Sequence, residues 1–323
     1  MSRSLGQNDI INEYDDSGGL TRDRIVLLGR RSAGKTVYLS LLYNLLWKSN
    51  NELSMKTVEG THHALLIKTA EELRRGQWPA ATQNMSQIPI EINYGGKTRL
   101  MIALDYPGEL FTNAFVKELS SDEIHTLLDH IDHAQALMLL VDPEHVAGED
   151  IDATIDNDYG IVQALNRLQN WAGGTKIPVV LIFTKIDQTN VVIKKHGGTE
   201  AFVRKYFPKL ISQLNHLIVC KVAAVKVAQN ADGRLIPKEN FESFNLDKPL
   251  RHCLEVIENI EGKKAEDKAY KKRVQFLDEL EAKKKKNSAL LTIFLLFVLV
   301  IFIIIVYYSF PKALWENLWN NIF

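Results

Sequence analysis

Features that the sequence lacks narrow its possible functions first. It has only two cysteines, Cys220 and Cys253, and no CxxC pair, which excludes a disulfide scaffold and a cysteine-based zinc site. Its formal net charge is zero, with 39 basic and 39 acidic residues, so nothing favours general nucleic-acid binding. The first twenty residues contain no apolar core of signal-peptide length, and we expect no export of the main domain.

The composition is that of a globular protein. Of 323 residues, 46% are hydrophobic and 24% are charged, which leaves room for one large domain. We expect five regions along the chain. They are a flexible lead over 1–22, a main globular domain over 23–260, a charged helical linker over 261–287, a transmembrane helix over 288–310 and a short interfacial tail over 311–323.

Apolar runs alternate with amphipathic segments through the main domain. Residues 24–28, 98–104, 135–142, 178–184 and 217–225 have the pattern of buried strands, and 88–94 pairs with 98–104 across Gly95-Gly96 as a hairpin. Helical patterns cover 36–48, 61–75, 113–131, 154–172, 199–217 and 247–260. The alternation predicts an α/β fold with a mainly parallel sheet and helices on both faces.

The C-terminal region contains a long uncharged run. Residues 289–308 are 20 residues without charge, glycine or proline, and as a helix they would span about 30 Å, the thickness of a bilayer core. The run of lysines 283–286 precedes them, and Lys312 follows. This bias predicts a single-pass protein with its main domain in the cytoplasm and its C-terminus on the far side, the bacterial inner membrane being the host we expect.

A phosphate-binding motif follows the first strand without a gap. Residues 29–36 match GxxxxGK[ST] and consist of Gly29, Arg30, Arg31, Ser32, Ala33, Gly34, Lys35 and Thr36. Such a turn points successive backbone N–H groups at phosphate oxygens, and the helix N-terminus adds partial positive charge. We expect Lys35 to reach the β- and γ-phosphates and the Thr36 hydroxyl to bind Mg²⁺.

Two further motifs follow later strands. Asp105 ends a strand and precedes Tyr106, Pro107 and Gly108, so the sequence predicts that its carboxylate holds Mg²⁺, directly or through water, while the Gly108 N–H approaches the γ-phosphate. Thr184-Lys185-Ile186-Asp187 follows another strand and resembles the guanine motif of the P-loop GTPases.

That resemblance implies roles for four residues. Asp187 would accept hydrogen bonds from guanine, Lys185 would lie over the base, Thr184 would brace the phosphate loop and Ala224 would offer only a backbone contact to the guanine oxygen. The usual SAK motif is missing at residues 223–225, which departs from the small-GTPase pattern.

The switch residues are less defined. A threonine that senses Mg²⁺ and the γ-phosphate should lie between the first helix and residue 88. Thr57, Thr61, Thr69 and Thr82 are available, and we favour Thr82 within WPAAT. Glu109 stands where many members of the superfamily have glutamine, so it could orient the attacking water, with slow turnover. A catalytic arginine could be Arg30, Arg31, Arg74 or Arg75, or come from a partner.

Together, GRRSAGKT, WPAAT, DYPGE and TKID resemble the TRAFAC-type GTPase domains, and most of all the prokaryotic double-GTPase group, over about residues 23–260. The resemblance implies a P-loop NTPase fold and a switch that binds GTP or GDP with Mg²⁺, hydrolyses GTP and acts on an unknown protein effector or activator, and the apolar run over 289–308 would anchor this switch in a membrane. A GTP-binding scaffold without hydrolysis and an ATP-driven P-loop enzyme remain the alternatives.

Overall fold

The computed structural model describes residues 24–29, 33–49, 51–80, 86–105, 108–148, 158–167, 177–213 and 218–309. Its strands are β1 Arg24–Gly29, β2 Leu53–Thr57, β3 Ser86–Tyr94, β4 Lys97–Asp105, β5 Ala134–Val141, β6 Val179–Phe183, β7 Ile218–Lys221, β8 Val227–Gln229 and β9 Leu235–Pro237. Its helices are α1 Lys35–Leu46, α2 Gly60–Arg74, α3 Gly108–Phe115, α4 Asp122–Asp132, α5 Pro143–Gly148, α7 Ile186–Lys195, α8 Thr199–Tyr206, α9 Pro208–Gln213 and α10 Lys248–Ser309, and residues 158–167 are also helical.

Seven strands form one sheet in the order β2-β3-β4-β1-β5-β6-β7. The pairs from β4 to β7 are parallel, whereas β2 pairs with β3 and β3 with β4 in antiparallel fashion. The β3–β4 hairpin turns at Gly95 and Gly96, whose φ angles of 56° and 75° suit a type I′ turn. The expected mainly parallel sheet and this hairpin are confirmed.

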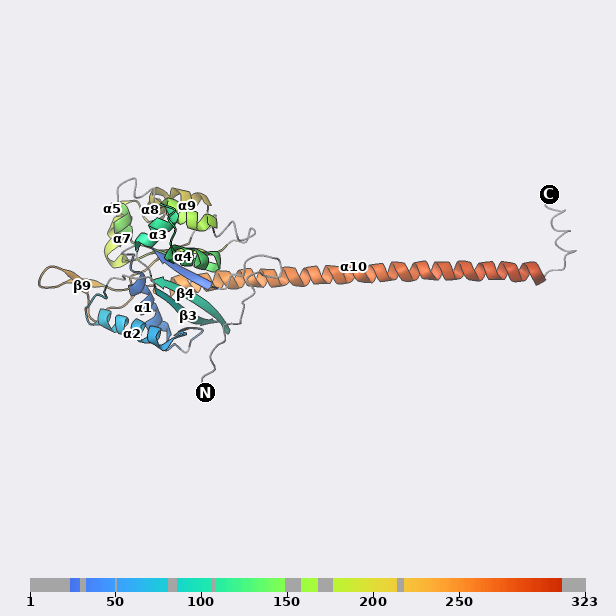
Figure 1. Cartoon of the computed structure of the whole chain (residues 1–323), viewed down its shortest axis with the longest axis horizontal. Helices are drawn as coiled ribbons and strands as arrows, with labels where there is room; N and C mark the ends of the chain where they lie inside the picture. Colours follow the sequence, from blue (N-terminus) through green and yellow to red (C-terminus); the bar gives the residue numbers. More distant parts are fainter. Residues whose placement is uncertain are drawn as a thin grey trace. The chain divides into compact units, whose positions relative to one another are not determined.

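The sheet is covered on both faces, which explains its continuous apolar strands. Along β1, Ile25 and Leu27 pack with α1, α2 and the first turns of α10, whereas Val26 and Leu28 pack with α3, α4, α8 and α9. In Figure 1, α1 and α2 lie on one side of the strands and α3, α4, α8 and α9 on the other.

Several expected elements differ in detail. The single helix predicted over 113–131 is two helices, because α3 ends at Phe115 and Ser121 caps α4, its Oγ accepting a hydrogen bond from the N–H of Ile124 at 3.2 Å. The helix predicted over 199–217 breaks before Pro208, because a residue preceding proline is disfavoured in the helical region. The last strand is shorter than 217–225.

Four elements were not predicted at all. They are the edge strand β2, the helices α5 and α7, and the β8–β9 hairpin. Each is short, and short segments carry too few periods of hydrophobic alternation to be recognised.

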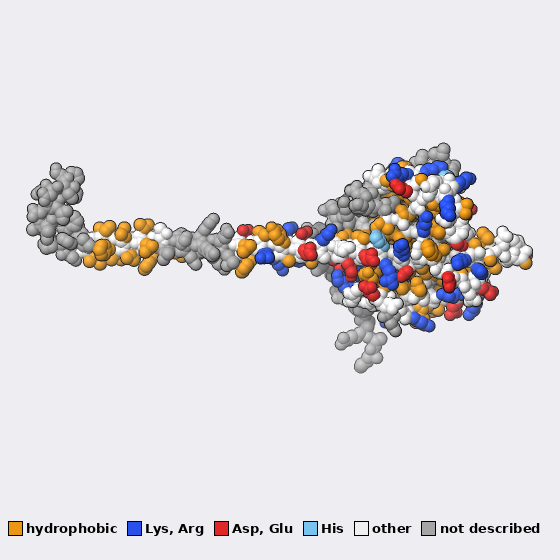
Figure 2. Space-filling model, turned by 180° about the vertical axis from the view of Figure 1, so that it is seen from behind, with side chains coloured by type: hydrophobic (Ala, Val, Ile, Leu, Met, Phe, Trp, Pro, Cys, Tyr) orange, Lys and Arg blue, Asp and Glu red, His pale blue; other side chains and the backbone are white. Residues whose placement is uncertain are grey.

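The chain divides into two compact units, 1–258 and 259–323, and the second contains most of α10. Apart from the half-buried Ile260 and Glu261, its described side chains are exposed. They are a mixture of charged and apolar groups over 259–279 and are apolar, apart from Thr292, over 290 and 292–305 (Figure 2). Among the residues that the structure describes, no helix meets the length and apolarity needed for a membrane crossing.

Candidate nucleotide-binding site

The predicted motifs converge at one edge of the sheet, where its parallel strands end. Gly29 of β1 is aligned with Leu140 of β5. Val141, the next residue, is aligned with Phe183 of β6, and Phe183 with Lys221 of β7. In open α/β sheets this carboxyl edge is where ligands bind, since the loops that follow each strand meet there. On the other side of β1, Leu27 is aligned with Ala103, which places the backbone of Asp105 beside that of Gly29.

The described part of the phosphate loop has the conformation that an anion-binding turn requires. Gly34 is left-handed, with φ 82°, and its carbonyl accepts the N–H of Tyr38 at 2.8 Å as α1 begins. The Lys35 ammonium donates to the Gly29 carbonyl at 2.9 Å and is only 8% exposed. A buried cation at a helix N-terminus, beside a left-handed glycine, fits a polyphosphate.

Gly29 is required by a close approach between strands. A Cβ added there would lie 2.9 Å from the Leu140 carbonyl oxygen and 3.0 Å from the Leu140 Cβ, closer than real Cβ atoms come to other atoms. The first glycine of the motif therefore allows β1 to reach β5 at the point where the loop turns.

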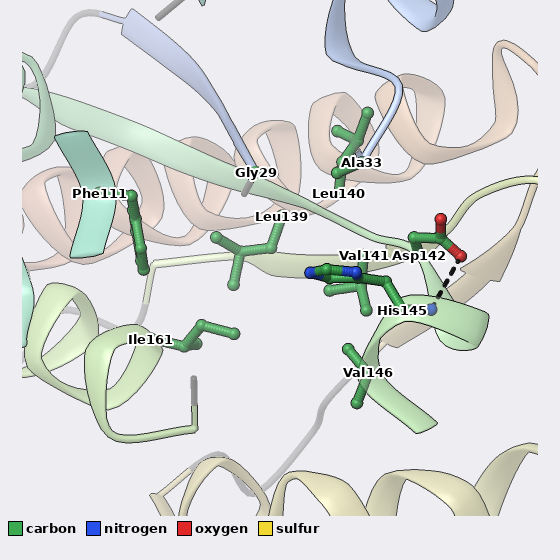
Figure 3. A pocket seen from close by; sticks show the side chains of 10 residues that line it. All are labelled: Gly29, Ala33, Phe111, Leu139, Leu140, Val141, Asp142, His145, Val146 and Ile161. Carbon is green, nitrogen blue, oxygen red and sulfur yellow. Dashed lines mark hydrogen bonds between the residues drawn. The ribbon is translucent and has the colours of Figure 1, made fainter. Parts of the chain in front are cut away.

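A small cavity of about 20 Å³ lies directly behind this loop. Phe111, Leu139, Ile161 and Val146 face it from three helices and β5, and the His145 ring lies at its edge (Figure 3). A space of this size holds about one water molecule, not a nucleotide. Together with its apolar lining, this makes it a packing gap between the phosphate loop and α3.

Thr184 and Lys185 both contact the end of β5 and the residue that follows it. The Thr184 Oγ1 donates to the Val141 carbonyl at 3.1 Å, so this buried threonine braces β5. The Lys185 ammonium lies 2.6 Å from the Oδ2 of Asp142, and its φ of 55° places it in the left-handed region as the cap of α7.

Asp142 holds this arrangement together and was missed in the sequence. Its Oδ1 accepts the N–H of Glu144 at 3.0 Å and caps α5, while its Oδ2 accepts from Lys185. The side chain is only 9% exposed. Asp142-Pro143 directly after a buried strand is a helix-start signal, because Pro suits the first helical position, and could have revealed the cap.

The Asp187 side chain lies beside the loop that follows β7. The N–H of Ile186 donates to the Val222 carbonyl at 3.2 Å, so the loop after β7 lies next to the predicted guanine motif. Ala224 follows Val222 by two positions in that loop. Partial burial raises the pKa of the Asp187 carboxyl above its usual value, against the opposing effect of backbone N–H groups that include that of Val227. Ala224 is held by its carbonyl, which accepts from the Ser243 Oγ at 2.7 Å.

The other predicted site residues are described only in part or not at all. Arg30, Arg31, Ser32 and Thr82 lie outside the described residues, and of Asp105, Gly108 and Glu109 only the backbone is described. Among the described side chains no three acidic, histidine or cysteine groups form a metal cluster. Thr36 at the start of α1 and the backbone of Asp105 lie at the same sheet edge, which suits a Mg²⁺ held next to phosphates.

The competing threonines and arginines have other contacts. Thr57 is buried with its Oγ1 3.5 Å from the Tyr43 hydroxyl, and Thr69 is buried in α2. The Arg74 guanidinium lies 6.0 Å from the centre of the Phe241 ring, and Arg75 is 3.6 Å from Glu71.

Comparisons with known proteins identify a family for this chain. The model of the family described as Double-GTPase 2 matches residues 23–240. No curated protein matches significantly. Among solved structures, nucleolar GTP-binding protein 1 from Plasmodium falciparum is 13% identical, with a TM-score of 0.40, over 76% of this chain and 91% of that one.

Two further structures are similar at the same low level. A bacterial selenocysteine-specific elongation factor EF-Sec is 16% identical, with a TM-score of 0.35, over 73% of this chain and 29% of that one. The signal recognition particle receptor SRb-GTP/SRX complex from Chaetomium thermophilum is 18% identical, with a TM-score of 0.35, over 65% of this chain and 94% of that one. The family model covers most of the chain, and the chain therefore belongs to the Double-GTPase 2 family, as a GTP-binding protein of the P-loop class.

Proposed function

We propose that the protein binds GTP at the carboxyl edge of its sheet and hydrolyses it as a Mg²⁺-dependent switch. One observation carries the proposal. The buried Lys35 ammonium lies at the start of α1, which follows β1, and the Thr184–Asp187 turn lies at the start of α7, which follows β6. Both therefore lie at the carboxyl edge of the parallel part of the sheet, with only β5 between their strands. A nucleotide with separate phosphate and base ends needs such an arrangement.

The chain's own residues divide the work between the two ends. Lys35 and the loop amides would bind phosphate oxygens, while Thr36, Asp105 and Thr82 would hold Mg²⁺, which supplies charge neutralisation at the β- and γ-phosphates. Asp187 would accept hydrogen bonds from guanine, which adenine cannot donate from the same edge. Glu109 would orient the attacking water or accept its proton.

The catalytic part of the proposal is tested by phosphate release from GTP and ATP with the purified full chain. We expect turnover with GTP only, and Glu109→Gln and Thr82→Ala should reduce its rate by about tenfold or more while nucleotide binding persists. Glu71→Gln, on the exposed face of α2, is the matched control. GTP binding without any turnover would favour a scaffold, and turnover of ATP alone would favour an ATP-driven enzyme.

We also propose that the run 289–308 anchors the protein in a membrane, with the main domain on the cytoplasmic side. The support is the sequence of that run and the four lysines before it. Part of the run lies outside the described side chains. An anchor would confine the switch to a membrane surface, where a protein effector or activator would meet it.

Extraction of isolated membranes with alkaline carbonate tests the anchor. The full chain should stay in the membrane pellet, and Leu296→Lys combined with Val300→Lys should release it, because each central lysine costs about 2.5–3.5 kcal/mol. Phe276→Lys with Leu277→Lys, also exposed on α10, is the matched control and should not. Protease added from the cytoplasmic side should digest the main domain, and protection of that domain would contradict the orientation.

A further inference from the structure

The β8–β9 hairpin has no role in the switch proposed above. It follows the loop of residues 222–225 and pairs outside the main sheet, β8 with β9. In Figure 1 it projects from the body near the ends of α1 and α2. Its strands have three residues each, so it needs partners outside itself to be held in place.

The hydrogen-bond pattern of the hairpin decides which groups face outward. The N–H of Lys238 donates to the Lys226 carbonyl at 2.7 Å, and that of Asn230 to the Arg234 carbonyl at 2.9 Å. In an antiparallel ladder, bonded and non-bonded pairs alternate. The intervening pair Val227 and Pro237 is therefore non-bonded, and the Val227 N–H and the Pro237 carbonyl point away from the hairpin.

The outward group of β8 faces the base end of the site. The Val227 N–H faces the Asp187 carboxylate as a donor and acts to lower the pKa of that carboxyl, against the larger effect of burial. A carboxylate has enough lone pairs to accept this bond and two more from a base edge. The N–H therefore fixes the direction of the carboxylate without consuming its capacity to bind guanine.

The outward groups of β9 face the segment that leads to Thr82. The Leu235 carbonyl accepts the indole N–H of Trp78 at 2.9 Å. A Cβ added to Gly76 would lie 3.2 Å from the Pro237 carbonyl oxygen, so the backbone passes close to β9 at a residue with φ 80°. The two outer edges of one hairpin thus contact Asp187 and the residues 76–78.

We propose that the β8–β9 hairpin is a positioning element for guanine recognition, in which Val227 orients Asp187 and the contact of Trp78 with Leu235 keeps the hairpin in place. This inference rests on the proposed binding of guanine nucleotides. Trp78 is then a positioning residue for base selection, although it lies 109 positions before Asp187 in the chain. It also joins the base end to the segment before the predicted switch threonine.

The test compares the affinities of GDP and inosine diphosphate, which lacks the exocyclic amine, for the full chain by calorimetry. Trp78→Phe keeps the ring but removes the N–H that Leu235 accepts, and Gly76→Ala places a methyl group against Pro237. Each should reduce the preference for GDP by about two- to tenfold, the effect of one hydrogen bond, while the affinity for inosine diphosphate stays within about twofold.

Matched controls separate this role from general destabilisation. Gly96→Ala imposes the same backbone strain, at φ 75°, where nothing lies within 4 Å of the added Cβ, and Trp47→Phe changes another tryptophan. Both should keep the wild-type preference. An unchanged preference in Trp78→Phe and Gly76→Ala, or an equal loss of both affinities, would overturn the role of the hairpin. A wild-type chain that does not prefer GDP would instead overturn the proposed function.

Discussion

The phosphate end and the base end of the site are built in different ways. The phosphate end is one continuous stretch, a strand, a turn and a helix start over residues 24–36, and its described contacts, such as Lys35 to Gly29, are local. The base end is assembled from Asp142, the Thr184–Asp187 turn, the loop after β7 and the β8–β9 hairpin. These parts are spread over 95 positions of the chain, from Asp142 to Pro237. A local cradle can bind any polyphosphate, whereas selection of a base here depends on tertiary contacts.

The largest expected effect comes from the phosphate end. Lys35→Ala removes the buried ammonium that charge-assisted hydrogen bonds to phosphate require, and should weaken GTP binding more than about a hundredfold. Calorimetry on the full chain measures it. Lys68→Ala on the exposed face of α2 is the control, and a near-unchanged affinity of the Lys35 variant would remove the distinction between the two ends.

A change at Asp187 should alter selection more than affinity. Asp187→Asn replaces an acceptor by a donor, so the preference should move from guanosine to xanthosine triphosphate by about tenfold or more, because xanthine presents an acceptor where guanine has its amine. Competition binding on the full chain measures the ratio. Asp232→Asn at the hairpin tip should leave it unchanged, and full GTP affinity in the Asp187 variant would contradict the base assignment.

Gly29→Ala tests the packing behind the cradle. The added methyl meets the Leu140 carbonyl, so the free energy of unfolding should fall by about 1–3 kcal/mol. Gly60→Ala, which has open space at the start of α2, should change it by less than about 0.5 kcal/mol. Chemical denaturation of both variants gives the comparison, and equal stabilities would show that β1 and β5 can separate at this point without loss.

Asp142→Asn tests whether the base end depends on its ion pair. Asparagine can still cap α5 with its carbonyl oxygen, but loses the charge opposite Lys185, so GDP affinity should fall by about two- to tenfold. Asp247→Asn removes a more exposed ion pair with Arg251, at the same 2.6 Å, and should have no effect on binding. If both variants bound alike, the Lys185–Asp142 pair would have no part in base recognition.

The smallest effect is a pH dependence of base selection. In the proposed mode of binding guanine donates to the ionised Asp187 carboxylate, and burial raises the pKa of that group. Acidification should therefore reduce the preference for GDP over inosine diphosphate at a higher pH than for an ordinary aspartate, whose pKa is about 3.9. Affinity ratios measured at about pH 7 and pH 5 would reveal it, and Asp187→Asn should show no such change.

These differences also explain what the sequence could predict. GRRSAGKT was recognisable because a strand, a turn and a helix start are adjacent in the chain, and the parallel sheet followed from its alternating strands. The contacts of Asp142 with Lys185 and of Trp78 with Leu235 were not, since they arise only when the end of β5, the start of α7, the β8–β9 hairpin and residues 76–78 are brought together by the fold. The Ser121 cap and Pro208 were visible as signals, and giving them more weight than the hydrophobic period would have divided both long helices correctly.

The central claim is that Lys35 and Asp187 bind the two ends of one guanine nucleotide. Its most direct test is the ratio of the affinities of GTP and ATP for the full chain, measured by calorimetry with Mg²⁺ present. The account predicts a preference for GTP of more than about a hundredfold, because ATP would lose two hydrogen bonds to a charged carboxylate. This preference should disappear in Asp187→Asn. Equal affinities for GTP and ATP, or a preference that survives in Asp187→Asn, would contradict it.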